Sequence, residues 1–186
     1  MRSHRMHNNV FSRQLILLLM LSVWAPVQAA DLRDAEQTKV DFVYQFSQFI
    51  TWPSDKTVKD DFQICLQGRK HNVRAWEEIE AKTVDLLPIR ITSCAKQGCS
   101  ACELVYITHW PGKSITSQLQ PFTHRGILTV SEQAGFAAAG GVIELYSDKG
   151  KLRFRINMDA AKRAGMGISS RLLKLADIVY DREKHE

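Results

Sequence analysis

The stretch from Leu152 to Tyr180 places the strongest constraint on how this chain folds. It opens with alternating apolar and basic side chains, the two-residue period of a half-buried strand: Leu152, Arg153, Phe154, Arg155 and Ile156. Asn157 is a favoured helix N-cap, and Gly165 stands where a left-handed helix stop would fall. A second helix is then predicted, with one apolar face: Leu172, Leu175, Ala176 and Val179. The pattern indicates a C-terminal packing unit, a strand that joins a sheet and helices that cover it.

The first 30 residues have the parts of an export signal. Three arginines precede the apolar run Leu15–Trp24, and the small residues Ala29 and Ala30 offer two cut sites. The run is shorter than the roughly 20 residues of an ordinary membrane span. We therefore expect residues 1–30 to be a cleaved signal peptide, with an uncleaved anchor as the alternative. Residues 31–186 are then expected to form a single domain of a periplasmic protein.

The elements between these two ends are expected to alternate between helix and strand. A helix over residues 34–51 should end at Trp52-Pro53, because proline disfavours helical geometry in the residue before it. Further helices are predicted at 72–81 and 113–120, and strands or extended segments at 62–66, 83–92, 103–108, 126–131 and 140–146. The last strand turns through residues 148–150 into the Leu152 strand as a hairpin. This order predicts a three-layer α/β sandwich, mainly parallel with an antiparallel edge hairpin and helices on both faces.

The charge is distributed unevenly. Without the signal peptide the chain has 22 basic and 20 acidic residues, which gives no electrostatic basis for nucleic-acid binding. Between residues 149 and 174, however, eight basic residues accompany a single acid, Asp159. Such a patch can steer an acidic partner, although it can also be a solvated face beside a buried strand. The candidate partner-binding residues are Arg153, Arg155, Arg171 and, in the neighbouring loop, Phe136.

All four cysteines follow the signal peptide: Cys65, Cys94, Cys99 and Cys102. An even number in an exported chain favours two disulfides, for which three connectivities are open. If the strands that carry Cys65 and Cys102 are neighbours, one bridge ties them together and Cys94–Cys99 closes a small loop. We favour this pairing.

Enzymatic and metal-binding interpretations have less support. Cys99-Ser100-Ala101-Cys102 is a CxxC motif, but it precedes a predicted strand and so lacks the helix N-terminus that activates redox dithiols. A zinc site would need a fourth ligand beside three cysteines, with His109 the nearest histidine downstream. The sequence contains no Gly-x-Ser-x-Gly, His-Glu-x-x-His or phosphate-binding loop. We expect neither a catalytic site nor a cofactor.

Two motifs together resemble the YfiR family of small exported proteins from Gram-negative bacteria. The first is FVYQFSQFITWP over residues 42–53, and the second is FRINMDAAKRAGMGISSRLLKLADIV over residues 154–179. The signal peptide, the length and the strand order also agree with the family. In its members the cysteine pair that matches Cys65 and Cys102 is a disulfide. Other members carry a further pair in the later half, and this chain has no cysteine after Cys102.

The resemblance implies a regulator and not an enzyme. YfiR-like proteins are periplasmic repressors that bind the periplasmic sensor domain of an inner-membrane diguanylate cyclase and hold it inactive. A peptidoglycan-associated lipoprotein of the outer membrane sequesters them, after which cyclic di-GMP rises and exopolysaccharide and biofilm follow. The family dimerises, so the resemblance also implies a homodimer.

Two other functions are kept as alternatives. The first is a periplasmic small-molecule-binding module whose pocket is lined by aromatic residues such as Tyr44, Trp52 and Trp76. The second is a thiol oxidoreductase that uses Cys99 and Cys102.

Overall fold

The computed structural model describes residues 27–53, 60–68, 73–94, 99, 101–108, 112, 114–122 and 124–181, with side chains from residue 35 onward. The chain divides into two units, Met1–Ala35 and Glu36–Glu186. Most of the expected signal peptide lies outside the described residues. None of the helices in the described part has the length and apolar content needed to cross a bilayer.

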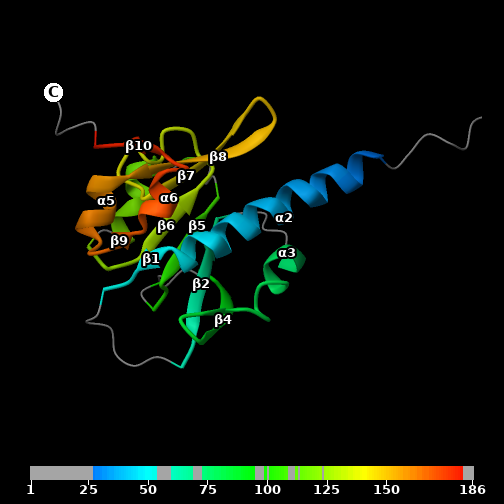
Figure 1. Cartoon of the computed structure of the whole chain (residues 1–186), viewed down its shortest axis with the longest axis horizontal. Helices are drawn as coiled ribbons and strands as arrows, with labels where there is room; N and C mark the ends of the chain where they lie inside the picture. The colour runs from blue at the N-terminus through cyan, green and yellow to red at the C-terminus, as the bar shows by residue number, and fades with distance from the viewer. Residues whose placement is uncertain are drawn as a thin grey trace, which may run out of the picture. The chain divides into compact units, whose positions relative to one another are not determined.

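The second unit is built on an eight-stranded sheet in the order β10-β8-β7-β6-β5-β2-β4-β3 (Figure 1). The strands are β2 (Phe62–Gln67), β3 (Thr83–Val84), β4 (Leu87–Ser93), β5 (Leu104–Ile107), β6 (Leu128–Ser131), β7 (Ile143–Asp148), β8 (Lys151–Asn157) and β10 (Asp177–Val179). Strands β4, β2, β5, β6 and β7 run parallel, while β8 returns antiparallel to β7. The predicted fold class is therefore confirmed. The hairpin lies one strand inside the edge, because β10 pairs parallel with β8.

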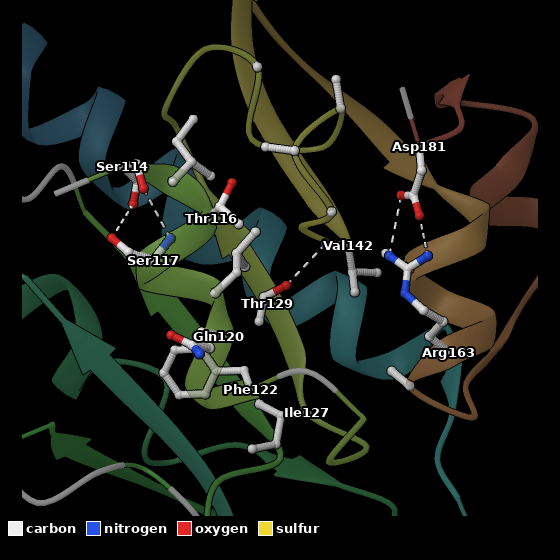
Figure 2. A pocket seen from close by; sticks show the side chains of 18 of the residues that line it. Ser114, Thr116, Ser117, Gln120, Phe122, Ile127, Thr129, Val142, Arg163 and Asp181 are labelled. Atoms are coloured by element: carbon white, nitrogen blue, oxygen red, sulfur yellow. Dashed lines mark hydrogen bonds and ion pairs between the residues drawn. The ribbon is translucent and has the colours of Figure 1, made fainter. Parts of the chain in front are cut away.

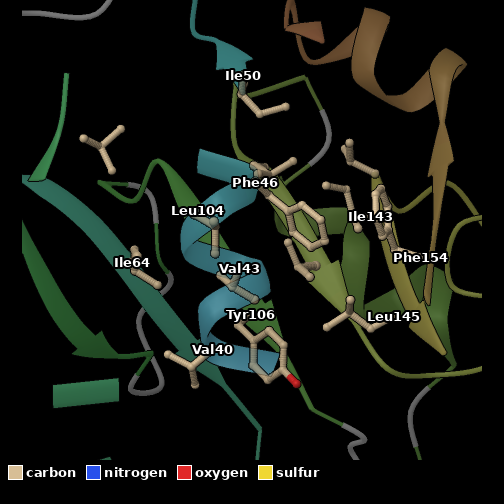
Figure 3. Packing of buried hydrophobic residues seen from close by; sticks show 14 of the residues in the cluster. Val40, Val43, Phe46, Ile50, Ile64, Leu104, Tyr106, Ile143, Leu145 and Phe154 are labelled. Carbon is tan, nitrogen blue, oxygen red and sulfur yellow. The ribbon is translucent and has the colours of Figure 1, made fainter. Parts of the chain in front are cut away.

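Helix α2 (Val27–Gln48) packs its apolar side chains onto one face of this sheet. Phe46 is 1% exposed, and its ring centroid lies 4.9 Å from that of Phe154 on β8. Phe42 also meets Phe154, edge to face at 6.1 Å. Figure 3 shows Phe46 pointing from α2 toward the strand residues Ile143 and Phe154. Aromatic and aliphatic burial of this kind is the main source of stability in such a core.

A second, smaller core covers the opposite face. Val105 and Ile107 of β5 contribute the sheet side of this core. The cover comes from α4 (Ile115–Leu119), the short 3-10 helix η1 (Gln120–Phe122) and the loop after β6. With apolar groups packed on both faces, β5 is buried throughout, as its continuous apolar sequence predicted.

The two sequence motifs that carry the family resemblance meet in space. The first motif ends in β1 (Ile50–Thr51), which pairs antiparallel with β9 (Gly167–Ile168) of the second motif. The Ser169 N–H donates to the Phe49 carbonyl at 3.0 Å. Gly167 lies so close that a Cβ there would stand 3.1 Å from Thr51. The two motifs therefore connect the end of α2 to the C-terminal unit through this strand pairing.

The second C-terminal helix is much shorter than predicted. Helix α5 (Met158–Arg163) begins after Asn157 and is followed by Gly165 at φ +69°, as predicted. Helix α6 (Ser170–Leu173), however, lasts a single turn, and the chain then enters β10. Leu175 was expected on a buried helix face and is 71% exposed. The open edge of β8 offers strand pairing to Asp177, Ile178 and Val179, and this tertiary pairing overrides the helical spacing.

Candidate functional site

Five polar side chains gather on the face of β7, β8 and β10 that points away from α2. Strand residues alternate between faces, and Phe154 and Ile143 occupy the α2 side. Glu144 pairs in register with Arg155, Tyr146 with Arg153, and Arg155 in turn with Asp177. We call these five residues the outer face: Glu144, Tyr146, Arg153, Arg155 and Asp177.

Hydrogen bonds and ion pairs connect the whole outer face. Arg155 contacts Glu144 at 2.7 Å and lies over the Tyr146 ring at 3.8 Å from its centroid. The Tyr146 hydroxyl donates to Asp177, and Arg153 reaches the same carboxylate at 3.4 Å. The bond from Tyr146 lowers the pKa of Asp177, and the same bond raises the pKa of Tyr146. The arrangement holds Tyr and Arg side chains, common anchors of protein interfaces, in fixed positions on an accessible face.

The basic cluster seen in the sequence is partly neutralised in space. Arg153, Arg155 and Arg163 pair with Asp177, Glu144 and Asp181, all of which lie outside the 149–174 segment. Arg171 is exposed on α6. The structure therefore places Arg153 and Arg155 together on one face and Arg171 on a separate element.

Phe136 cannot serve as an exposed partner contact. Its side chain is 0% exposed and belongs to the second core. Gly141 lies against the Phe136 ring so closely that a side-chain carbon at residue 141 would overlap it. The prediction failed because a loop position was taken as exposed, whereas this loop folds back onto the sheet. Glu144 helps to hold the loop in place by accepting the Ala137 N–H at 3.0 Å.

Asn157 joins the outer face to α5 and to the end of the chain. Its side-chain oxygen accepts the Ala160 N–H at 2.9 Å, which caps α5 as predicted. Its amide nitrogen donates to the Ala137 carbonyl at 2.5 Å and to Asp181 at 2.8 Å. Asp181 also accepts two bonds from Arg163. These bonds fix β10 and its following residues against the core.

A cavity of about 1000 Å³ opens beside this network. Figure 2 shows the Arg163–Asp181 pair at one wall and Ser114, bonded to Ser117, at the other, with Thr129 between them. Small residues line much of the floor: Ala134, Gly135, Ala138, Ala139, Gly140, Ala160 and Ala164. This cavity was hard to predict from the sequence, because its lining residues come from separate segments that meet only in the folded chain.

The aromatic residues predicted for a ligand pocket do not line this cavity. Trp76 is 1% exposed and packs on Tyr106 with ring centroids 4.9 Å apart. Trp52 packs edge to face on Phe62 at 5.1 Å, and Tyr44 lies under the Lys82 ammonium. These three side chains belong to the main core or its margin, and none of them lines this cavity.

The four cysteines form the two pairs favoured from the sequence. Cys65 bonds to Cys102 and Cys94 to Cys99, with Cα–Cα separations of 6.0 and 5.6 Å. Cys65 lies on β2, which pairs with β5 just beyond Cys102. The two cysteines of the CxxC motif belong to different disulfides and do not bond to each other. This geometry contradicts the thiol oxidoreductase alternative, which needs a single Cys99–Cys102 dithiol.

Comparison with known families decides the relationship. The family described as YfiR/HmsC-like (DUF4154) matches residues 36–177. This range includes the first motif, all but the last two residues of the second motif, and every strand of the large sheet except the last two residues of β10. The chain belongs to the YfiR/HmsC-like family. YfiR-like proteins are regulatory and non-enzymatic, and this membership supports a regulator of cyclic di-GMP signalling.

A solved structure has a similar fold. The crystal structure of a conserved domain protein from Vibrio cholerae O1 biovar El Tor aligns with a TM-score of 0.52 at 11% sequence identity. The alignment covers 77% of the present chain but only 59% of the Vibrio protein. The likeness extends to the fold and not to the activity of that longer chain.

Proposed function

We propose that this protein is a periplasmic repressor that binds the sensor domain of an inner-membrane diguanylate cyclase. It holds the sensor in its inactive conformation and so lowers cyclic di-GMP and the biofilm output that depends on it. An outer-membrane, peptidoglycan-associated lipoprotein relieves the repression by sequestering the repressor. The repressor acts as a homodimer. The observation that carries this proposal is family membership across both motifs.

Repression of this kind works by a population shift. A binder that prefers the inactive sensor moves the conformational equilibrium by the difference between its affinities for the two states. A rigid binding surface favours such discrimination, because little ordering is needed on contact. The paired, hydrogen-bonded side chains of the outer face supply a surface of this kind.

We propose the outer face, together with Arg171, as the surface that contacts the cyclase. Arg153 is 48% exposed at its side chain, whereas Arg155 contacts the buried carboxylate of Glu144. Reversal of charge at Arg155 would place two carboxylates together and disturb the fold. The informative substitutions are therefore Arg153→Glu and Arg171→Glu, with Arg74→Glu, at an exposed position of α3 (Val73–Glu77), as the matched control.

Titration calorimetry with the purified periplasmic domain of the cyclase tests this surface. The Arg153→Glu/Arg171→Glu variant should bind at least about tenfold more weakly, because the loss of a few interface contacts costs 1.4 kcal/mol or more. Arg74→Glu should bind like the unmodified protein. Unchanged affinity of a folded double variant would exclude this surface and leave the repressor function to be tested separately.

The alternative function is a periplasmic ligand-binding module, and the cavity beside Arg163 favours it. Its volume is that of a site for a small organic molecule. A ligand that binds only the folded state raises the melting temperature by mass action. A thermal-shift screen of small metabolites, repeated with Arg163→Ala, tests this function, and the absence of any stabilising compound would leave it without support.

A further inference from the structure

Three sulfur atoms drawn from both disulfides lie together. The Sγ atoms of Cys65, Cys94 and Cys99 are all within 4.8 Å of one another. Strand pairing brings them to this point, because β4 runs beside β2 and Cys94 directly follows β4. The Cys94 N–H donates to the Leu66 carbonyl at 2.8 Å, which fixes the start of the Cys94–Cys99 loop against β2.

The two disulfides differ in their exposure to solvent. Cys65 and Cys102 are each 2% exposed, and Cys99 is 7% exposed. Cys94 is only partly buried and lies at the margin of the second core. Cys94 is therefore the most exposed of the four cysteines and the one that a thiol in solution reaches most easily.

We infer that Cys94–Cys99 is an entry site for thiol reductants, and that it relays thiol–disulfide exchange to the buried Cys65–Cys102 bond. This inference is independent of the proposed repressor function. The substrate class is a small thiol or a dithiol protein, and the site acts by exchange between neighbouring sulfurs. Exchange requires a thiolate placed to attack a disulfide sulfur, and Cys65 is the disulfide sulfur beside Cys99.

The relay has three balanced steps. The external thiolate attacks the Cys94 sulfur, which forms a mixed disulfide on Cys94 and releases the Cys99 thiolate. The Cys99 thiolate attacks the Cys65 sulfur, which forms a Cys65–Cys99 bond and releases the Cys102 thiolate; that thiolate takes a proton from water. A second external thiolate then attacks the external sulfur of the mixed disulfide, which yields the oxidised external disulfide and the Cys94 thiolate. Two electrons pass from two external thiols to the protein.

The relay makes an unusual prediction about reduction rates. Removal of the Cys94–Cys99 bond should slow the reduction of the Cys65–Cys102 bond, because the buried bond then loses the Cys99 thiolate that attacks it. The oxidised protein, the Cys94→Ala/Cys99→Ala variant and the Cys65→Ala/Cys102→Ala control are each treated with reduced glutathione. Free thiols are alkylated at intervals and assigned by peptide mass spectrometry.

We expect Cys65–Cys102 to be lost at least about tenfold more slowly in the Cys94→Ala/Cys99→Ala variant, since only direct attack on a buried sulfur remains. Cys94–Cys99 should be reduced at the unmodified rate in the Cys65→Ala/Cys102→Ala control, because it is attacked first. Equal or faster loss of Cys65–Cys102 in the first variant would overturn the relay.

A second variant keeps the test independent of any change in stability. Cys94→Ala leaves the Cys99 thiol beside Cys65 without added reductant. Non-reducing peptide mapping of this variant at pH 8 should contain a Cys65–Cys99 peptide, and a map that contains only Cys65–Cys102 would overturn the relay.

Discussion

At the scale of single residues, Asn157 shows how one side chain combines roles that the sequence reveals only in part. Its capping of α5 was predictable, because the cap partner lies three residues away. Its bonds to Ala137 and Asp181 were not, because those partners lie 20 and 24 residues away and meet it only through the sheet. The same limit applies to the acids of the outer face, which strand pairing brings to Arg153 and Arg155.

Substitution of Asn157 should cost more than the loss of an ordinary cap. Asn157→Ala removes the cap, worth about 1 kcal/mol, and leaves the Ala137 carbonyl without its donor, which costs a further 1–3 kcal/mol or so. We expect urea denaturation to give a free energy of unfolding about 2–4 kcal/mol lower. Ser114→Ala, at the exposed N-cap of α4, is the control and should cost about 1 kcal/mol or less. Equal losses in the free energy of unfolding for the two variants would contradict a role for Asn157 beyond capping α5.

Tyr106 should make the fold sensitive to alkali. Burial, reinforced by the bond to Glu132, raises the pKa of Tyr106 above its ordinary value of 10.0. A raised pKa in the folded state means that this contribution to stability is complete below pH 10 and is lost as the pH rises above it.

Urea denaturation at pH 8 and pH 11 checks this expectation. Tyr106→Phe should flatten the alkaline decline, because the phenol that must ionise is absent. Tyr180→Phe, at a position that is 53% exposed, should show the same alkaline decline as the unmodified protein. An unchanged decline in Tyr106→Phe would assign the alkaline sensitivity to other groups.

At the scale of elements, strands were predicted more reliably than the C-terminal helix. The runs that became β2, β5 and β6 are rich in apolar and β-branched residues and are bounded by turn signals, so they were recognisable. The spacing of Leu172, Leu175, Ala176 and Val179 fits a helix equally well, but the free edge of β8 captures residues 177–179 as a strand. Which element fills an open sheet edge depends on the rest of the sheet, and a local pattern does not contain that information.

The docking of α2 on the sheet should depend on Phe154. Phe154→Ala removes the ring that meets both Phe42 and Phe46, and truncation of a buried aromatic costs about 3–5 kcal/mol. We expect a loss of this size in the free energy of unfolding, measured by urea denaturation. Leu175→Ala, at a 71% exposed position, should change it by about 0.5 kcal/mol or less. A small loss for Phe154→Ala would mean that α2 is held mainly by other contacts.

At the scale of the whole molecule, the strand–helix order and the two motifs were enough to predict the fold class and the family. The candidate binding surface was predicted only in part. Arg153 and Arg155 do share a face, but Phe136 is buried and the neutralising acids come from distant segments. The regulator has a sheet face held by paired charges, on a domain whose two motifs join the end of α2 to its C-terminal unit.

The most direct test of this account is the intracellular concentration of cyclic di-GMP. It should be measured in the parent strain, in a deletion of this gene and in a double deletion that also removes the cyclase, with both proteins expressed in the parent. The single deletion is then complemented either with the unmodified gene or with the Arg153→Glu/Arg171→Glu variant. The account predicts a rise in the single deletion, no rise in the double deletion, and restoration by the unmodified gene only. An unchanged concentration in the single deletion, with the cyclase expressed and active, would contradict it.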